Sequence, residues 1–196
     1  MTTRLDQQLN FILEIDKLKS ILRQTPITGL ERRPENDAEH SWHIAMMASL
    51  LAEYAASAVN VSRVVQMLLL HDVVEIDAGD TFAYDATGYS DKDERECLAA
   101  DRLFGLLPAE QAAEFRALWD EFEAVVTPES RYANALDRLQ PLLLNSRTGG
   151  GSWSNHHITR TQVLTRMDPV RTGAPALWPV VLAIVEDASS RGWLIL

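Results

Sequence analysis

The dipeptide His71-Asp72 lies at the end of an apolar run, VVQMLLL, that occupies positions 64–70. It places a neutral nitrogen ligand beside an anionic oxygen ligand in a segment that is expected to exclude water. A carboxylate in such a segment is costly unless a positive charge meets it. Imidazole and carboxylate together suit divalent first-row transition metals. The dipeptide therefore predicts a metal centre.

Two further residues could complete the ligand set, His40 in AEHSW and Asp137 in NALDRLQ. They lie on different expected helices, and the core of a helical bundle can bring ligands together from facing helices. Successive helical residues diverge by about 100°, so His71 and Asp72 share a metal only if it lies between their directions. Taken alone, His40 could be a buried histidine with ordinary partners, and Asp137 a surface carboxylate.

The elements that must position these residues are expected to be helices, because apolar residues recur at helical spacing in one segment after another. The expected helices cover residues 4–23, 36–55, 61–76, 91–106, 109–125, 129–146 and 175–191. Thr127 and Thr159 are predicted helix caps. Polar residues and glycine predict a loop over 81–91, and the glycine-rich stretch 147–157 cannot continue a helix.

No pair of strands is evident, and the predicted fold class is all-α. We expect one domain, 1–196, with 147–196 as a C-terminal extension packed on the helical bundle. Trp153, Trp178 and Trp193 are expected to make that packing.

Composition narrows the function classes. The 196 residues are 46% hydrophobic and 23% charged, as in ordinary soluble globular proteins. No apolar run approaches the roughly 20 residues that cross a bilayer, and the N-terminus lacks the apolar core of a signal peptide. We therefore expect a cytoplasmic protein with no membrane partner. The single cysteine, Cys97, excludes an internal disulfide and a thiolate zinc cluster.

The net charge of −10 weighs against binding of a nucleic-acid polymer, which needs many lysine and arginine contacts to phosphates. It does not exclude a small phosphorylated ligand, because a metal ion and a few local arginines can hold one phosphate.

Four segments carry a resemblance to a known family. They are KLKSILR (17–23), RPENDAEHSWHIAMMA (33–48), MLLLHDVVEIDAGD (67–80) and ALDRLQPLLLN (135–145). The chain resembles the HD-domain metal-dependent phosphohydrolases, most closely the subgroup similar to 5′-deoxynucleotidases, up to about residue 150. The resemblance implies a helical bundle with the metal site in its core.

The resemblance also implies roles for individual residues. One divalent metal ion (Mn, Co, Fe, Ni, Zn or Mg) would be held by four ligands, His40, His71, Asp72 and Asp137. Glu75 and Asp80 match the family's two catalytic carboxylates. The spacing agrees for Glu75, because it lies four residues after His71 on the same helix face. The alternative for Glu75 is an ordinary solvated helix residue.

Arginine is the residue expected to meet a phosphate, because its planar fork donates two parallel hydrogen bonds and stays charged. The resemblance assigns phosphate contact to Arg23, and Arg33 also matches an arginine of the family pattern. Arg32 is an additional candidate without a matching position. The alternative is that these arginines pair with acidic neighbours, namely Glu31, Glu35 or Asp37.

The sequence departs from the nucleotidase pattern where sugar and base would be sensed. Gln24 stands where those relatives carry a tryptophan, and the segment between Arg23 and His40 is about two residues longer. The preference for deoxyribose therefore stays open. His43 is expected in the core or at its rim. His156 and His157, beyond Gly149–Gly151, are expected on a flexible surface loop, with a lid or a phosphate-cradling loop as the alternatives.

The predicted activity is hydrolysis of a nucleoside 5′-monophosphate, including deoxyribonucleotides, to nucleoside and phosphate by a metal-activated water. One alternative is hydrolysis of another phosphoester, such as a nucleoside triphosphate, an alarmone or a cyclic nucleotide. A second is a non-catalytic interaction module stabilised by a metal. The apolar helices suggest a homodimer.

Overall fold

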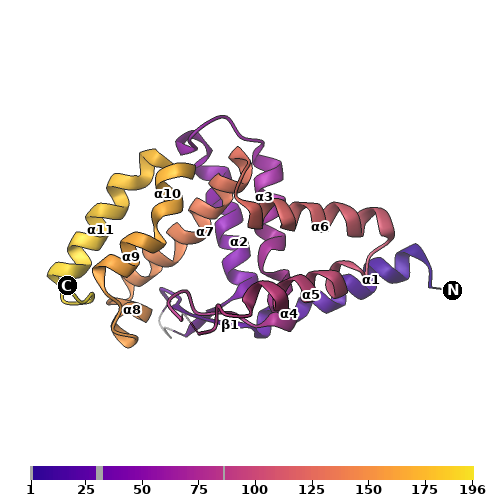
Figure 1. Ribbon diagram of the computed structural model, residues 1–196, viewed down its shortest axis with the longest axis horizontal. Coiled ribbons are helices and arrows are strands. Elements are labelled where there is room, and N and C mark those ends of the chain that lie inside the picture. The colour runs from indigo at the N-terminus through magenta and orange to yellow at the C-terminus, as the bar shows by residue number, and fades with distance from the viewer. Residues whose placement is uncertain (1, 30–32, 86) are drawn as a thin grey trace.

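The computed structural model describes residues 2–29, 33–85 and 87–196, and it is built of helices apart from one small sheet (Figure 1). The helices are α1 (Arg4–Ile15), α2 (Asp37–Leu50), α3 (Val61–Leu70), α4 (Glu75–Ala78), α5 (Lys92–Phe104), α6 (Ala109–Ala124), α7 (Pro128–Arg147), α8 (Gly151–Asn155), α9 (Arg160–Arg166), α10 (Asp168–Gly173) and α11 (Trp178–Ser190). Short 3₁₀ segments cover Asp16–Ser20, Ala52–Tyr54, His71–Val74 and Pro175–Leu177. The all-α prediction is confirmed. Within the described residues, no helix combines the length and the apolarity needed to cross a membrane.

Helix α7 is the central helix of the bundle. It contacts α2, α3 and α6 on one side and α10 and α11 on the other. The Thr127 side chain accepts from the Ser130 amide, and Pro128 occupies the first turn, so the predicted start of this helix is confirmed. More than half of its residues are buried, which suits a helix packed on several faces. Ligands on α7 are therefore held inside the protein.

The prediction that no strands pair was wrong. Strands β1 (Leu22–Pro26) and β2 (Pro34–Asn36) form an antiparallel pair, so the helix expected over 4–23 ends at Ile15 and gives way to a 3₁₀ turn. The apolar spacing of 4–23 fits a helix locally, but pairing with β2 decides the conformation of its last residues. Arg23 consequently lies on a strand.

The segment 61–76 is helical as expected, but it is not one continuous α-helix. α3 ends at Leu70, and the next four residues, His71–Val74, form a tighter 3₁₀ turn before α4 begins. Successive side chains in such a turn diverge by about 120° rather than about 100°. Gly79, with φ of 76°, ends α4.

The residues after α7 form short helices that fold back along it. α10 and α11 both contact α7, and Trp153 on α8 is 2% exposed. The glycine-rich stretch ends α7 as expected, but residues 151–155 form α8 rather than a loop. Gly150 has φ of 90°, and a Cβ there would lie 2.2 Å from Oγ of Ser154. The predicted Thr159 cap of α9 is confirmed.

Candidate metal centre and its cavity

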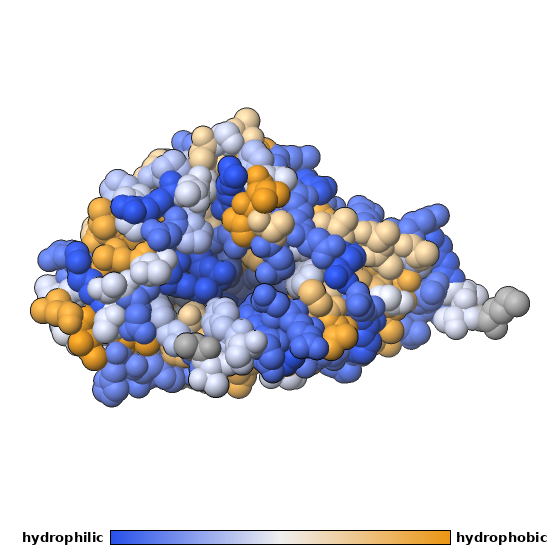
Figure 2. Space-filling model, viewed as in Figure 1, coloured by the Kyte–Doolittle hydropathy of each residue, from blue (hydrophilic) through white to orange (hydrophobic). Residues whose placement is uncertain are grey.

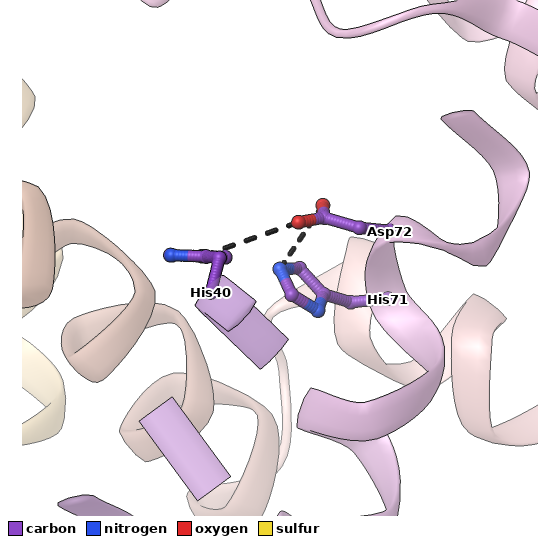
Figure 3. Close-up of side chains that lie close together, drawn as sticks. All are labelled: His40, His71 and Asp72. Carbon is purple, nitrogen blue, oxygen red and sulfur yellow. Dashed lines mark ion pairs between the residues drawn. The ribbon is translucent and has the colours of Figure 1, made fainter. Parts of the chain in front are cut away.

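His40, His71 and Asp72 converge in the interior (Figure 3). Their ligand atoms lie within 4.8 Å of one another, and all three residues are buried. Oδ1 of Asp72 lies 3.0 Å from Nε2 of His71, and Oδ2 lies 4.0 Å from Nε2 of His40. The 3₁₀ turn supplies the adjacent pair, and α2 supplies His40 from across the core.

Asp137 on α7 approaches the same place. Its Oδ1 lies 3.0 Å from Nε2 of His40 and 3.8 Å from Nε2 of His71. Asp137 is 4% exposed, so the alternative of a surface carboxylate is excluded. The structure therefore brings together all four residues of the predicted ligand set.

The outer nitrogens of both histidines are fixed by acceptors. Nδ1 of His71 donates to the carbonyl oxygen of Leu68 at 2.9 Å. Nδ1 of His40 lies 3.2 Å from Oε1 of Gln140, an amide oxygen that can only accept. Gln140 is itself held by Glu35, at 2.6 Å from its Nε2. In each neutral ring the remaining nitrogen, Nε2, then presents a lone pair to the site, which is how metal-binding histidines are oriented.

The residues present fit a divalent metal ion. Nε2 of His71 is buried and makes no hydrogen bond within the described part of the chain. Burial lowers the pKa of His71, but the carboxylates of Asp72 and Asp137 outweigh it and raise the pKa to about 10. The cluster therefore attracts a positive charge. Two imidazoles and two carboxylates form a donor set suited to first-row transition metals.

Arg23 contacts both Asp72 of this ligand set and a further buried carboxylate, Asp37. Its Nη1 donates to Oδ2 of Asp72 at 2.7 Å and to Oδ1 of Asp37 at 3.2 Å. Asp37, which the sequence interpretation left outside the site, is fully buried. Burial and the charge of Asp72 raise the pKa of Asp37 to about 7, although Arg23 opposes this.

Glu75 lies with Asp37 and Asp72, each offering an oxygen within 4.8 Å of the others. It is 7% exposed, so the alternative of a solvated helix residue is excluded. Its Oε2 makes no hydrogen bond within the described residues. Burial, followed by the charges of Asp72 and Asp37, raises the pKa of Glu75 well above its usual range. A carboxylate in this state is a stronger base than one in water.

Two adjoining cavities open beside the ligand set. The two cavities share six of their lining residues, namely Arg23, Asp80, Thr81, Asp137, Arg138 and Arg166. Figure 2 shows a hydrophilic hollow near the centre of this face of the molecule. Burial raises the pKa of Asp80, and the charge of Asp72 adds to this effect, although Arg23 opposes it. Asp80 thus faces the cavity as a carboxyl group that holds a proton more readily than an exposed one.

The other predicted residues lie further out. Arg33 is exposed and donates to Oε2 of Glu39 at 2.8 Å, and it is not among the residues that line the two cavities. Its phosphate contact stays a prediction. Arg32 lies outside the described residues. His43 is half-buried, with Nδ1 3.1 Å from Nε2 of Gln140, which places it at the rim of the site.

The glycine-rich segment reaches the edge of the cavity. Nε2 of His156 lies 3.2 Å from Oε1 of Gln24, and its ring centroid lies 4.4 Å from that of Phe82. The side chain that replaces the family's tryptophan is therefore in contact with the C-terminal part of the chain.

Sequence reasoning missed Arg138 and Arg166. Nη1 of Arg138 lies 2.6 Å from Oδ2 of Asp137, and Arg166 reaches the cavity from α9. Arg138 could have been found, because it follows a predicted ligand on the same helix. No signal in the sequence points to Arg166.

Comparison with known proteins identifies the family. The model of a family described as HD domain matches residues 15–178. A 5′-deoxynucleotidase of Danio rerio is 28% identical over 139 residues, covering 71% of this chain and 68% of the relative. One of Xenopus laevis is 30% identical over 136 residues, covering 67% and 66%. The matches span about two thirds of the length of these curated relatives.

Solved structures agree with this assignment. A protein of Magnetospirillum magnetotacticum, described as a predicted metal-dependent phosphohydrolase, is 56% identical, with a TM-score of 0.92 over 98% of this chain and 99% of that one. The PH0347 protein of Pyrococcus horikoshii, at 21% identity and a TM-score of 0.64 over 91% and 98%, shares the fold. With its buried histidine and aspartate cluster, this chain belongs to the HD-domain family.

Proposed function

We propose that this protein is a metal-dependent phosphomonoesterase that hydrolyses nucleoside 5′-monophosphates, deoxyribonucleotides among them. The observation that carries the proposal is the contact between Arg23 and Asp72, in which a guanidinium group suited to phosphate lies against a cluster suited to a metal, beside one cavity. The names of the Danio and Xenopus relatives, both 5′-deoxynucleotidases, support a nucleotide substrate.

The proposed metal is one divalent ion held by His40, His71, Asp72 and Asp137. When bound, such an ion polarises the phosphoryl group and lowers the pKa of water from about 16 toward neutrality. The candidates are Mn, Co, Fe, Ni, Zn and Mg. The two imidazoles favour a first-row transition metal over Mg, which prefers oxygen ligands.

Glu75 and Asp80 would move the protons. Burial raises the pKa of Glu75, which makes its carboxylate a stronger base toward the attacking water. Asp80 faces the cavity beside Arg23 and would deliver a proton to the departing 5′-oxygen. The water oxygen then bonds to phosphorus while the bond from phosphorus to the 5′-oxygen breaks.

Arg23 would hold the substrate phosphate. Asp72 and Asp37 both accept hydrogen bonds from its Nη1, which fixes the guanidinium plane at little cost in entropy when the ligand arrives. Its other N–H groups can then donate to phosphate oxygens, the pairing for which guanidinium geometry is suited.

A metal and substrate screen tests the proposed function. Purified protein is incubated with ribo- and deoxyribonucleoside 5′-monophosphates and with Mn²⁺, Co²⁺ or Mg²⁺, and released phosphate is measured. We expect turnover that needs the metal and that falls at least about 100-fold in Glu75→Gln, which keeps the shape and removes the base. Glu94→Gln is the matched control, because Glu94 is exposed on α5. Failure of every nucleotide to turn over would contradict the proposal.

We also propose that the protein is a cytoplasmic homodimer. Apolar side chains stay exposed at helical spacing on α1 and on α2, namely Leu5, Leu9, Ile12 and Leu13 on the first and Trp42, Met46 and Leu50 on the second. Light scattering on the purified protein tests this assembly. Leu9→Glu and Met46→Glu identify which of the two helices forms the interface, and a monomeric mass for the unsubstituted protein would refute the dimer.

A further inference from the structure

Arg138 and Arg166 bring two guanidinium groups to one wall of the cavity, and we call them the outer arginine pair. Arg138 lies on α7, and Arg166 is the last residue of α9. Both line the two adjoining cavities that also contain Arg23 and Asp80. The cavity therefore has two cationic positions, one at Arg23 and one at the outer arginine pair.

Within the described residues, Asp137 is the only carboxylate that forms an ion pair with a member of the outer arginine pair. Nη1 of Arg138 donates to Oδ2 of Asp137, but that carboxylate is also a proposed metal ligand. Arg166 makes no ion pair with a carboxylate in the described part of the chain, and its side chain donates to the hydroxyl of Tyr89 at 3.4 Å. Burial lowers the pKa of Arg166, and the nearby charge of Arg138 lowers it further.

Three other arginines are more fully neutralised. Arg23, Arg102 and Arg116 each pair with two carboxylates, and the protein has 28 acidic residues against 18 basic ones. Arg166 is half-buried, and burying a charge that has no carboxylate partner is costly. Two like charges beside one cavity in an acidic protein are therefore best explained by an anion that arrives with the ligand.

Arg166 also shows where that anion would lie. It lines a further cavity with Tyr84, Tyr89 and Thr165, and neither Arg23 nor any proposed metal ligand lines that space. Arg166 is therefore at the boundary between the metal cavity and the outer one. An anion bound there is a different group from the phosphate held at Arg23.

We propose that the outer arginine pair binds a second phosphoryl group, so that the preferred substrates are nucleotides that carry two. The inference rests on the proposed function, since it takes the first phosphate to be bound at Arg23. Guanidinium groups suit this role because they bind phosphate oxygens through parallel hydrogen bonds. Nucleoside 3′,5′-bisphosphates and 5′-diphosphates share the required chemistry and differ in the spacing of their phosphates.

Calorimetric binding measurements on metal-loaded protein test the proposal. All proteins in this comparison carry Glu75→Gln, which removes the proposed base and so keeps turnover low during the measurement. The ligands are adenosine 5′-monophosphate, adenosine 5′-diphosphate and adenosine 3′,5′-bisphosphate. We expect one of the two-phosphate ligands to bind about tenfold more tightly than the monophosphate, a difference of ~1.4 kcal/mol. The tighter of the two identifies the spacing that the site accepts.

Arg166→Gln should remove most of this tenfold preference and leave monophosphate binding within about twofold, because it removes one charge at the outer position. Arg166→Lys should recover part of it. Arg160→Gln is the matched control, since Arg160 lies on the same helix, pairs with Glu186 at 3.6 Å and lines none of these cavities.

Two results would overturn the proposal that the outer arginine pair binds a second phosphoryl group. One is that no two-phosphate ligand binds more tightly than the monophosphate, and the other is that Arg166→Gln weakens all three ligands equally. The proposed phosphatase is judged separately, by phosphate release from monophosphates in the unsubstituted protein. A protein without that activity that still binds two phosphates through Arg166 would refute the phosphatase and retain the anion position.

Discussion

Arg23 donates a hydrogen bond of 2.7 Å to the carboxylate of Asp72, and this contact couples the residue proposed to bind phosphate to a proposed metal ligand. Oδ1 of the same carboxylate faces His71 at 3.0 Å. Each oxygen of the Asp72 carboxylate therefore contacts a different basic side chain, Arg23 through Oδ2 and His71 through Oδ1. A change at Arg23 would therefore alter both the proposed phosphate site and the electrostatics of the proposed metal ligands.

Substitution of Arg23 should separate these two effects. In Arg23→Gln we expect kcat/KM for nucleoside monophosphates to fall about 100- to 1000-fold, the usual loss when one donor to a developing oxyanion is removed. Arg23→Lys keeps the charge without the planar fork and should fall between this variant and the unsubstituted protein. Metal content, measured by elemental analysis, should stay at one ion per chain. Loss of the ion with the activity would mean that Arg23 serves the metal site alone.

Metal binding should release protons. His71 has a pKa raised to about 10 in the metal-free cluster, so it carries a proton when the pH is near neutral, and Nε2 must lose that proton before it can bind a metal. The apparent affinity should therefore rise with pH up to that pKa, by up to about tenfold per pH unit for each proton released. Calorimetry in two buffers of different ionisation enthalpy measures the proton count. A pH-independent affinity would contradict this account.

Asp37 should make the metal-free protein less stable as the pH rises. Its pKa is raised from 3.8 to about 7 in the folded state, so the folded chain binds a proton that the unfolded chain has already lost. The protonated Asp37 carboxyl stabilises the folded state at low pH. This contribution to the free energy of unfolding is lost as the pH rises from about 4 to about 7, and the loss is at most ~4 kcal/mol for a shift of this size.

Asp37→Asn, which cannot ionise, should reduce that decline. Urea denaturation of both proteins at intervals across the same pH range measures it. Asp85→Asn is the control, because Asp85 is exposed. Parallel stability curves for Asp37→Asn and the unsubstituted protein would show that another group is responsible.

The contact between Gln24 and His156 should affect substrate choice more than chemistry. Gln24 lines the cavity beside Arg23, and His156 holds its amide at 3.2 Å. We expect His156→Ala to change the ratio of KM values for ribo- and deoxyribonucleotides by about threefold, because one constraint of ~0.7 kcal/mol is lost near the sugar. The value of kcat should change little. Equal effects on both sugars, or a loss of kcat alone, would disprove a role in sugar selection.

Local sequence context decided how much of this site was predictable. His71 and Asp72 stand out because they end an apolar run, and the resemblance then supplied His40 and Asp137, which the structure places beside them. The helix predicted through Arg23 was wrong, because β1 depends on pairing with β2 rather than on its own periodicity. The contribution of Arg166 to the cavity wall was not predictable either, because Arg166 lies on a helix that is distant in sequence from the other site residues.

The residues that line the cavity come from distant parts of the sequence, so they are synthesised at different times. The four residues proposed to hold the metal are complete once Asp137 has been made, whereas Trp153 and Arg166, which line the same cavity, follow later. A nascent chain could therefore assemble its metal cluster before the substrate cavity is enclosed. A metal ion taken up at that stage would favour the packing of α2, α3 and α7 against one another.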